Sequence, residues 1–338
     1  NSLVLTENYT NLGNVLHAAG RLEEATQSHR MSLEITEKHA IAAPDSRFLQ
    51  SRLASALANL AVLLAESGRF AEAEDCYKKV LAISEKLAAD FPDTPDCRHL
   101  LVVGRQNLAS LLQTTGRLAE AETKYKENLS TLQKLAADFP DATVYRHRLV
   151  DNYHDLGNVL RGSDRLAEAE SDYRRAQDIC EKLAKDFPGT PDYRYKLADT
   201  LRSLGIVLRD TGRLGGAETL MRASLGSAER LVSEFPDVKA YRQAVVKAHG
   251  DLGTVQYRAG DWKAAVASLN KCFELGGEGD VDTEIEFYLA MTYWQLGDKE
   301  QARKSCDRAM RWMDEHLLGV SNRAQLTEPG KRGVGLAA

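Results

Sequence analysis

The chain has 338 residues, of which 28% are charged, 43% are hydrophobic and only 7% are aromatic. This mixture is typical of helices rich in alanine and leucine rather than of sheets, and it predicts an all-α fold. The formal net charge of −5 excludes an overall positive field that would attract a phosphate backbone, so we expect no nucleic-acid partner.

The cysteines and the hydropathy pattern bound the cellular setting. Five cysteines lie far apart and form no Cys-x-x-Cys pair, which predicts reduced thiols, no zinc site and a cytoplasmic location. No run approaches the roughly 20 consecutive apolar residues of a membrane helix, so we expect no membrane contact within this segment. The sequence begins at Asn1 without a methionine and inside a helical pattern, which leaves open a longer protein with a signal or membrane segment upstream.

A turn signal recurs along the chain at a fixed spacing. Glycine or aspartate followed by arginine or aspartate occurs every 48 residues, and a last copy follows after 37 residues. The copies are Gly20-Arg21, Gly68-Arg69, Gly116-Arg117, Asp164-Arg165, Gly212-Arg213, Gly260-Asp261 and Gly297-Asp298. Repetition of a unit this long predicts about seven hairpins, each of which covers its apolar stripe by packing against the next copy.

Two further positions are fixed relative to each turn. A leucine followed by glycine or alanine precedes the turn by eight residues, and an alanine follows the turn by five residues. The leucines are Leu12, Leu60, Leu108, Leu156, Leu204, Leu252 and Leu289, and the alanines are Ala25, Ala73, Ala121, Ala169, Ala217, Ala265 and Ala302. Small residues at paired positions let two helices approach closely, so we expect each copy to be two tightly packed helices.

A third landmark marks the end of most copies. Phenylalanine followed by proline occurs at Phe91-Pro92, Phe139-Pro140, Phe187-Pro188 and Phe235-Pro236. The residue before proline is disfavoured in the α region, so each second helix should end there. The spacing leaves room for two helices of about 18–20 residues in each copy.

These spacings resemble the tetratricopeptide repeat. The pattern is Leu-Gly, an apolar residue three positions later, and an alanine twelve positions after the glycine. The fourth copy shows it as Tyr153, Leu156, Gly157, Leu160, Ala169, Tyr173 and Ala176. The resemblance covers about residues 3 to 317 and implies a tetratricopeptide-like, right-handed solenoid of helical hairpins. The sequence departs from the family in its period, which is 48 rather than the usual 34 residues.

The organisation that follows has three parts. We predict six long hairpins over residues 1–275, with turns near residues 20, 68, 116, 164, 212 and 260. A seventh, shorter hairpin or cap should occupy residues 281–317, after a flexible joint at the glycine-rich run from Gly276 to Asp280. We expect residues 318–338 to form a disordered tail.

A second resemblance concerns the long copies. The runs Leu118-Ala119-Glu120-Ala121-Glu122 and Leu166-Ala167-Glu168-Ala169-Glu170 resemble arrays that follow the catalytic domain of some bacterial serine/threonine protein kinases. This resemblance implies a neighbouring catalytic domain outside the segment and no kinase activity within it.

Motifs of catalysis are absent from the sequence. It has no glycine-rich kinase loop, no phosphate loop, no nucleophile elbow and no His-x-x-x-His zinc pair. The run Asp186-Phe187-Pro188-Gly189 matches a kinase metal motif only superficially, because it belongs to the recurring turn between hairpins. We therefore predict no catalytic residues, no metal, no cofactor and no enzymatic activity.

A binding surface is predicted from helical geometry. With 100° per residue, positions −6, −3, +1 and +4 from the small residue of each first helix lie away from the apolar stripe. By resemblance to the family, these positions, which we call the groove flank, line the concave groove of the solenoid. Only Asn14 and Asn158 match the asparagine place of the family's carboxylate clamp, and the accompanying lysine is missing, so clamp activity is not expected.

The groove flank of copies four to six is rich in cations. We predict that an acidic peptide binds there through Asn158, Arg161, Arg202, Arg209, Lys247 and Tyr257. The alternative is a solvated charged flank that Asp151 and Asp199 partly neutralise. In the last copy, Phe287, Met291 and Trp294 are either an apolar binding patch or packing residues of a terminal unit.

One recurring cation favours structure over binding. Arg98, Arg146, Arg194 and Arg242 occupy one register in successive copies. What every copy shares is what every copy needs in order to stack, so these arginines should have a structural role.

The sequence thus predicts a non-catalytic scaffold for protein–protein interaction that binds a peptide or protein segment. Two alternatives stay open. One is the C-terminal regulatory region of a bacterial serine/threonine kinase, and the other is helical-repeat RNA binding, which the acidic balance disfavours.

Overall fold

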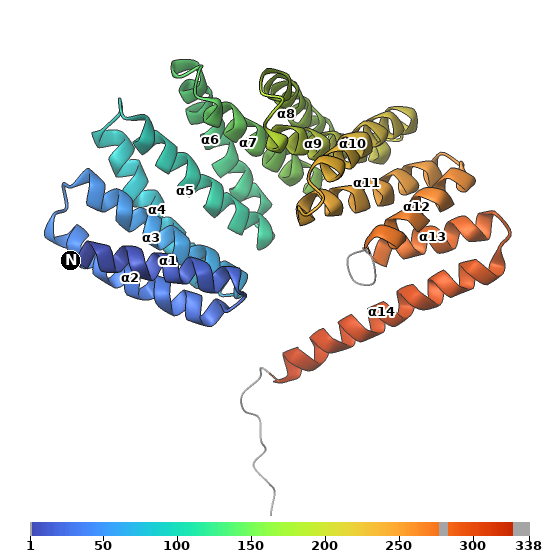
Figure 1. Cartoon of the computed structure of the whole chain (residues 1–338), viewed down its shortest axis with the longest axis horizontal. Coiled ribbons are helices and arrows are strands. Elements are labelled where there is room, and N and C mark those ends of the chain that lie inside the picture. The colour runs from blue at the N-terminus through green and yellow to red at the C-terminus, as the bar shows by residue number, and fades with distance from the viewer. Residues whose placement is uncertain (1, 277–282, 327–338) are drawn as a thin grey trace, which may run out of the picture. The chain divides into compact units, whose positions relative to one another are not determined.

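The computed structural model shows consecutive α-helices joined by short turns (Figure 1). The structure describes residues 2–276 and 283–326, and these ranges hold 14 helices and no strand. The chain divides into two compact units after Asp186, within the array that the sequence presents as continuous. The all-α, tetratricopeptide-like fold is therefore confirmed.

The first unit contains four hairpins. Its helices are α1 (Ser2–Ala18), α2 (Leu22–Ala42), α3 (Arg47–Glu66), α4 (Phe70–Asp90), α5 (Pro95–Thr114), α6 (Leu118–Asp138), α7 (Thr143–Gly162) and α8 (Leu166–Asp186). Each odd-numbered helix packs against the even-numbered helix that follows it, and α2, α4 and α6 also pack against the first helix of the next hairpin. Helices α2, α4 and α6 thus use one side to pack within their own hairpin and another side to pack against the next hairpin.

The second unit continues the same plan with three hairpins. Its helices are α9 (Pro191–Asp210), α10 (Leu214–Glu234), α11 (Lys239–Arg258), α12 (Trp262–Gly276), α13 (Thr283–Gln295) and α14 (Lys299–Leu326). Helices α9 and α10, α11 and α12, and α13 and α14 form the hairpins, and α10 and α12 contact the next hairpin.

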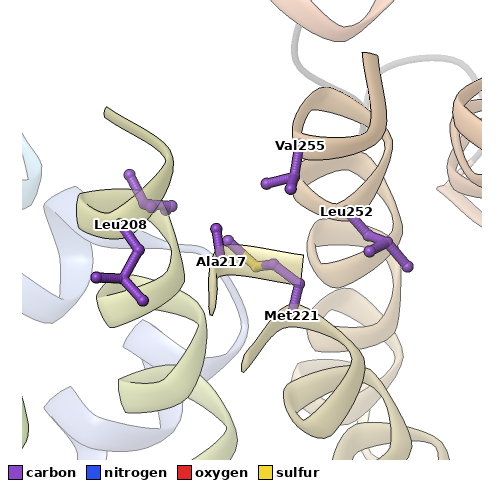
Figure 2. Packing of buried hydrophobic residues seen from close by; sticks show 6 residues of the cluster. Leu208, Ala217, Met221, Leu252 and Val255 are labelled. Carbon is purple, nitrogen blue, oxygen red and sulfur yellow. The ribbon is translucent and has the colours of Figure 1, made fainter. Parts of the chain in front are cut away.

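Figure 2 shows why α10 and α11 adhere. Ala217 and Met221 of α10 join Leu252 and Val255 of α11 in one buried cluster, which Leu208 of α9 also enters. Each of these side chains is 6% exposed or less. The core of the unit therefore lies between successive hairpins as well as within them.

The hairpin turns lie at the predicted glycines. Among the residues that the structure describes, six glycines have positive φ, from 74° at Gly20 and Gly68 to 82° at Gly297, and the fourth turn has Asp164 at 59°. Glycine adopts this left-handed region without the clash that a Cβ atom causes, and aspartate tolerates it better than most residues. The next amide reaches back to close the helix, as in the 2.8 Å bond from the Arg117 amide to the Leu112 carbonyl.

The predicted small residues lie at the helix crossings. The recurring alanines of the first six hairpins are fully buried, and Ala302 is 6% exposed. On the facing helix, a Cβ atom added at Gly157 would lie 2.8 Å from the ring of Tyr173, and one added at Gly253 would lie 2.6 Å from Leu269. The crossings have no room for a larger residue on either side.

Three of the four recurring arginines, Arg98, Arg146 and Arg194, tie the two helices of a hairpin together, whereas Arg242 donates to the Pro236 carbonyl in the turn before its helix. Arg98 pairs with Asp138 at 2.9 Å and Arg194 with Glu234 at 2.6 Å, from the start of the first helix to the end of the second. Each arginine is only 21–25% exposed. The predicted structural role of this register is therefore what the geometry shows.

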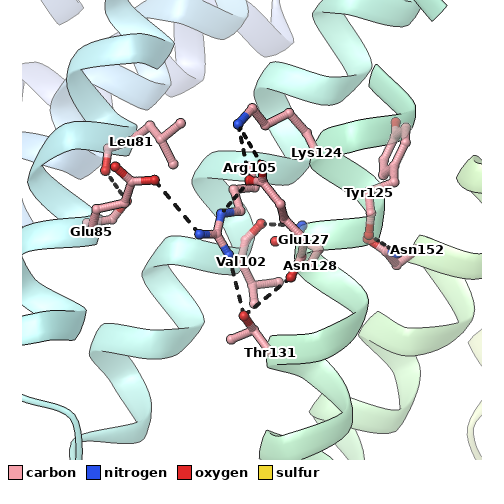
Figure 3. Close-up of polar contacts among 11 residues, drawn as sticks. Leu81, Glu85, Val102, Arg105, Lys124, Tyr125, Glu127, Asn128, Thr131 and Asn152 are labelled. Carbon is pink, nitrogen blue, oxygen red and sulfur yellow. Dashed lines mark hydrogen bonds and ion pairs between the residues drawn. The ribbon is translucent and has the colours of Figure 1, made fainter. Parts of the chain in front are cut away.

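A second polar network joins three helices of the first unit (Figure 3). The guanidinium of Arg105 on α5 lies 3.8 Å from Glu85 of α4 and 3.4 Å from Glu127 of α6. Nearby, the buried amides of Asn128 and Asn152 donate to the backbone carbonyls of Val102 and Tyr125, both at 2.9 Å. These bonds fix the register between helices that apolar packing alone would hold less specifically.

The C-terminal segment differs from its prediction. Helix α14 continues to Leu326, so the expectation of a disordered tail from residue 318 is wrong for its first part. Gly319 weakens a helix by about 1 kcal/mol, but the residues after it are ordinary helix formers that each add a backbone hydrogen bond. Residues 327–338, and most of the predicted joint at Gly276 to Asp280, lie outside the described residues.

One helix has unusual hydropathy. In the described part of the chain, only α3 is long and apolar enough to pass as a membrane span by length and composition, with a mean hydropathy of 1.4 in its most apolar window. The same apolar residues pack in the hairpin stack, since Leu57, Leu60, Leu63 and Leu64 are each 5% exposed or less. Packing accounts for the composition of α3.

Replacing a turn glycine and a helix glycine with alanine should change the free energy of unfolding in opposite directions. Replacing Gly116 with alanine should lower the free energy of unfolding by about 1–2 kcal/mol, because the turn needs positive φ and open space surrounds the new methyl group. Replacing Gly226, inside α10 and equally unobstructed, should raise it by roughly 0.5–1 kcal/mol. Urea unfolding followed by circular dichroism measures both, and equal effects would contradict the turn assignment.

The helix crossing gives a second test. Ala169→Leu should lower the free energy of unfolding by roughly 1–3 kcal/mol, because Ala169 is fully buried at the crossing of α7 and α8. Ala167→Leu makes the same change on an exposed side of α8 and should be within about 0.5 kcal/mol of the parent. Thermal unfolding of the two variants compares them, and a neutral Ala169→Leu would refute close packing there.

Candidate peptide-binding surface

The six predicted binding residues are divided between the two units. Asn158 and Arg161 lie on α7 in the first unit, and the other four lie on α9 and α11 in the second unit. The two groups are therefore separate parts of the candidate surface, and each is described by itself.

In the first unit, Asn158 is used by the hairpin itself. Its side-chain oxygen accepts a 2.7 Å hydrogen bond from the Tyr173 hydroxyl, and its amide nitrogen lies 3.3 Å from Nδ1 of His154. Arg161, one turn further along α7, is exposed, and its side chain makes no hydrogen bond or ion pair with the described residues. Arg161 is thus the predicted residue of this unit whose charge is available to a ligand.

In the second unit, Arg202 forms a bridge between two first helices. Its guanidinium lies 2.9 Å from Asp251 of α11 and 3.1 Å from Asp199 of its own helix. Burial alone would lower the pKa of Arg202, but the two carboxylates raise it above its ordinary value. The charge is therefore permanent and locally neutralised, so Arg202 stabilises the stack of α9 on α11.

Arg209 is also engaged within the protein. Its Nε atom lies 2.9 Å from the Asp210 carboxylate, and its Nη1 atom donates to the hydroxyl of Thr254 at 3.1 Å. Arg258 lies 3.7 Å from the same carboxylate oxygen. Two arginines share one aspartate here, which leaves a net positive charge beside the end of α9.

Tyr257 packs onto the next hairpin. Its hydroxyl lies 3.8 Å from the sulfur of Met291, and its ring meets that of Tyr288 edge to face with centroids 5.5 Å apart. Met291 and Trp294 are nevertheless 41% and 61% exposed, so part of the predicted apolar patch of the last hairpin faces solvent. Packing and an accessible patch therefore coexist at α13.

Lys247 is the second available cation. It is exposed on α11 and makes no ion pair with the described residues. Lys247 and Arg202 border a cavity of about 40 Å³ that Tyr195, Ser224 and Gln243 also line. A cavity of this size holds about one water molecule rather than a side chain.

The sequence analysis did not predict the polar pairs that join the first helices of successive hairpins. The two residues of each pair are 49 residues apart, which is one residue more than the 48-residue period. The pairs are His17 with Glu66 at 2.6 Å, Gln106 with Asp155, and Arg202 with Asp251 at 2.9 Å. A search for complementary residues at this spacing would have found them.

A larger hollow lies on the groove flank of the first unit. It has a volume of about 360 Å³ and lies between α3, α4 and α5. Its lining includes Val62, Ala65, Glu66, Phe70, Asn107, Ser110 and Thr114. Val62 and Phe70 are 37% and 39% exposed. Charge alone could not have predicted this hollow, because most of its lining is apolar or uncharged.

Reactive side chains do not gather at one place. No group of three or more histidine, cysteine or acidic side chains lies together as a metal site would require, within residues 2–276 and 283–326. Burial raises the pKa of the Cys272 thiol to about 11, so this cysteine stays protonated at neutral pH.

These features define a stacked-hairpin protein with a polar flank on its first helices, and the family models agree with that class. Tetratricopeptide repeat models match residues 9–40, 53–96, 153–192 and 197–237, and another tetratricopeptide repeat model matches residues 250–312. The chain belongs to the tetratricopeptide repeat family.

Solved structures with the same fold are distant in sequence. BtubC from P. vanneervenii is 20% identical with a TM-score of 0.52, over 78% of this chain and 97% of that one. A Rap protein complexed with competence and sporulation factor is 15% identical with a TM-score of 0.53, over 92% and 76%. A signal transduction ATPase with a tetratricopeptide repeat sensor from Pyrococcus horikoshii is 12% identical with a TM-score of 0.65, over 92% and 43%.

No curated protein sequence matched the chain. The structural similarities establish the fold alone. The predicted similarity to arrays of bacterial serine/threonine kinases stays a prediction.

The Arg202 bridge predicts an effect on stability. Arg202→Ala should lower the free energy of unfolding by about 1–3 kcal/mol, because it leaves the largely buried Asp251 carboxylate without its cation. Lys247→Ala, a change of the same charge on an exposed side chain, should cost less than about 0.5 kcal/mol. Chemical denaturation compares the variants, and equal stability would show that Arg202 is free for other roles.

Proposed function

We propose that this chain is a non-catalytic protein-interaction scaffold that binds an acidic peptide or protein segment on the groove flank of its first helices. The observation that carries the proposal is the contrast among the predicted cations. Arg202 is neutralised by two carboxylates inside the second unit and Arg209 is held by Asp210 and Thr254, whereas the side chains of Arg161 and Lys247 are exposed and unpaired among the described residues.

An exposed arginine or lysine on a rigid helix suits recognition of carboxylates. The helix fixes the direction of the charge, and the guanidinium of Arg161 offers two parallel donors to one carboxylate. The net positive charge that Arg209 and Arg258 leave around Asp210 extends the same preference in the second unit.

An apolar hollow also supports the binding of a peptide or protein segment. The hollow of about 360 Å³ in the first unit has room for a side chain of a bound segment, and its exposed Phe70 and Val62 would be covered on binding. The complex of a Rap protein with competence and sporulation factor shows that one protein of this fold binds such a factor. We therefore expect recognition by a few charged anchors and one apolar contact.

Selection of random 12-residue peptides on the immobilised chain tests the proposal. We expect the selected sequences to be enriched in aspartate and glutamate, and their binding to weaken as salt is raised. Fluorescence anisotropy with a selected peptide should show a loss of about threefold for Arg161→Gln or Lys247→Gln, the effect of an exposed ion pair of roughly 0.5–1 kcal/mol.

A matched control separates a site from general charge. Lys79→Gln and Arg230→Gln remove the same charges from exposed positions on second helices and should leave binding unchanged. Because Arg161 and Lys247 belong to different units, loss in only one variant assigns the peptide to that unit. Peptides without acidic enrichment, or equal losses in the control variants, would refute the proposal.

A further inference from the structure

The second hairpin contains a cavity of about 420 Å³ at the end where α3 begins and α4 finishes. We call it the α3–α4 cavity. Apolar side chains such as Ile83, Leu87 and Phe91 line it together with charged ones, of which Asp90 is the last residue of α4. Its volume lies in the range of pockets that hold small ligands, so it has room for a long side chain.

In three later hairpins an arginine of the chain itself fills the corresponding space. Arg98 of α5 reaches Asp138 at the end of α6, at 2.9 Å, and its guanidinium lies 5.8 Å from the centre of the Phe139 ring. The corresponding pairs are Arg146 with Asp186 at 4.0 Å and Arg194 with Glu234 at 2.6 Å. These arginine side chains are mostly buried, so each one occupies the space between the start of a first helix and the end of a second helix.

The second hairpin keeps the groups that receive this arginine but lacks the arginine. Asp90 and Phe91 precede Asp138 and Phe139 by 48 residues, whereas Gln50 has the place of Arg98. The Gln50 side chain donates to the Ala40 carbonyl of α2 at 3.2 Å. Asp90 is exposed, and its side chain makes no hydrogen bond or ion pair with the described residues. The α3–α4 cavity is therefore shaped and charged like a site that holds a guanidinium elsewhere in this chain.

The other charges around the cavity permit a cation. Lys86 lines it, but lysine has the same place in α6 and α8, as Lys134 and Lys182, where the arginine pairs form beside it. Asp45 adds a second carboxylate to the lining. The presence of Lys86 is thus compatible with a bound guanidinium.

Arg47, the first residue of α3, is the one feature of the lining that would compete with such a ligand. Its guanidinium lies 5.8 Å from the centre of the Phe91 ring, and it donates to the Thr94 hydroxyl at 3.4 Å. The side chain is exposed and does not pair with Asp90. Arg47 therefore shares the ring but leaves the carboxylate accessible.

We propose that the α3–α4 cavity binds an arginine side chain of a partner protein. The guanidinium would pair with Asp90 beside the Phe91 ring, and the alkyl stem would lie against Ile83 and Leu87. Arginine suits this site because its planar guanidinium can pair with a carboxylate and stack on a ring at the same time. The cavity shares no residue with the groove flank, so the inference does not depend on peptide binding there.

Titration with a small arginine derivative tests the site directly. The probe is N-acetyl-L-arginine amide, which reproduces an arginine within a peptide. Methyl NMR of the whole chain should show a saturable shift of the Ile83 δ-methyl signal and none of Ile206, which is buried in the second unit. N-acetyl-L-citrulline amide has the same shape without the charge and should bind at least about fivefold more weakly.

Substitutions at the cavity test its geometry. Asp90→Asn should weaken binding about threefold or more, whereas Asp178→Asn removes the same charge from an exposed position on α8 and should leave binding unchanged. Gln50→Arg should abolish binding, because the chain would then fill the cavity as it does in the later hairpins. Arg47→Gln should strengthen binding about twofold, because it removes the competitor for the ring.

Circular dichroism checks that each variant keeps the helix content of the parent, which we expect because Arg47 and Asp90 are exposed. Equal binding of the arginine and citrulline probes, or no saturable shift of Ile83, would overturn the proposal. Unchanged binding in Asp90→Asn or in Gln50→Arg would do the same. Tighter binding of free L-arginine than of the amide would overturn the assignment to a partner's side chain, because the charged backbone groups would then be recognised.

Discussion

A helical hairpin of this kind cannot cover its own apolar surface, and the whole structure depends on that constraint. Within a hairpin, one small residue faces one large residue at the crossing, as Gly157 faces Tyr173 and Gly253 faces Leu269. Within a unit, the outer side of a second helix then covers the next hairpin, as Met221 covers Leu252. Stability therefore comes from contacts between neighbours, which is why identical residue types can be buried in one copy and exposed in another.

The same constraint decides which charges are available. Stacking brings the first helices of successive hairpins together, and the polar residues along that line pair with each other across one repeat. Arg202 meets Asp251 in this way, and its guanidinium, predicted from the sequence to bind a ligand, becomes part of the stack. Recognition is left to residues such as Arg161 and Lys247, whose side chains are exposed and make no ion pair with the described residues.

The groove flank, which we propose as an interface, follows from the same logic. The groove flank is a side of the first helices that stacking covers only in part, and it holds charged, polar and apolar segments in turn. A ligand on this surface would be recognised by the residues that differ among copies.

The sequence alone determined the hairpin turns, the close crossings and the fold. These depend on local requirements: positive φ at Gly116, a proline after Phe139 that stops a helix, and the absence of a bulky side chain at Ala169. The sequence did not show that Arg202 and Tyr257 are engaged, or that α14 continues past residue 318. Those facts depend on which helix lies against which side chain, and only the tertiary structure decides that, because burial and charge pairing are properties of neighbours that lie far apart in the chain.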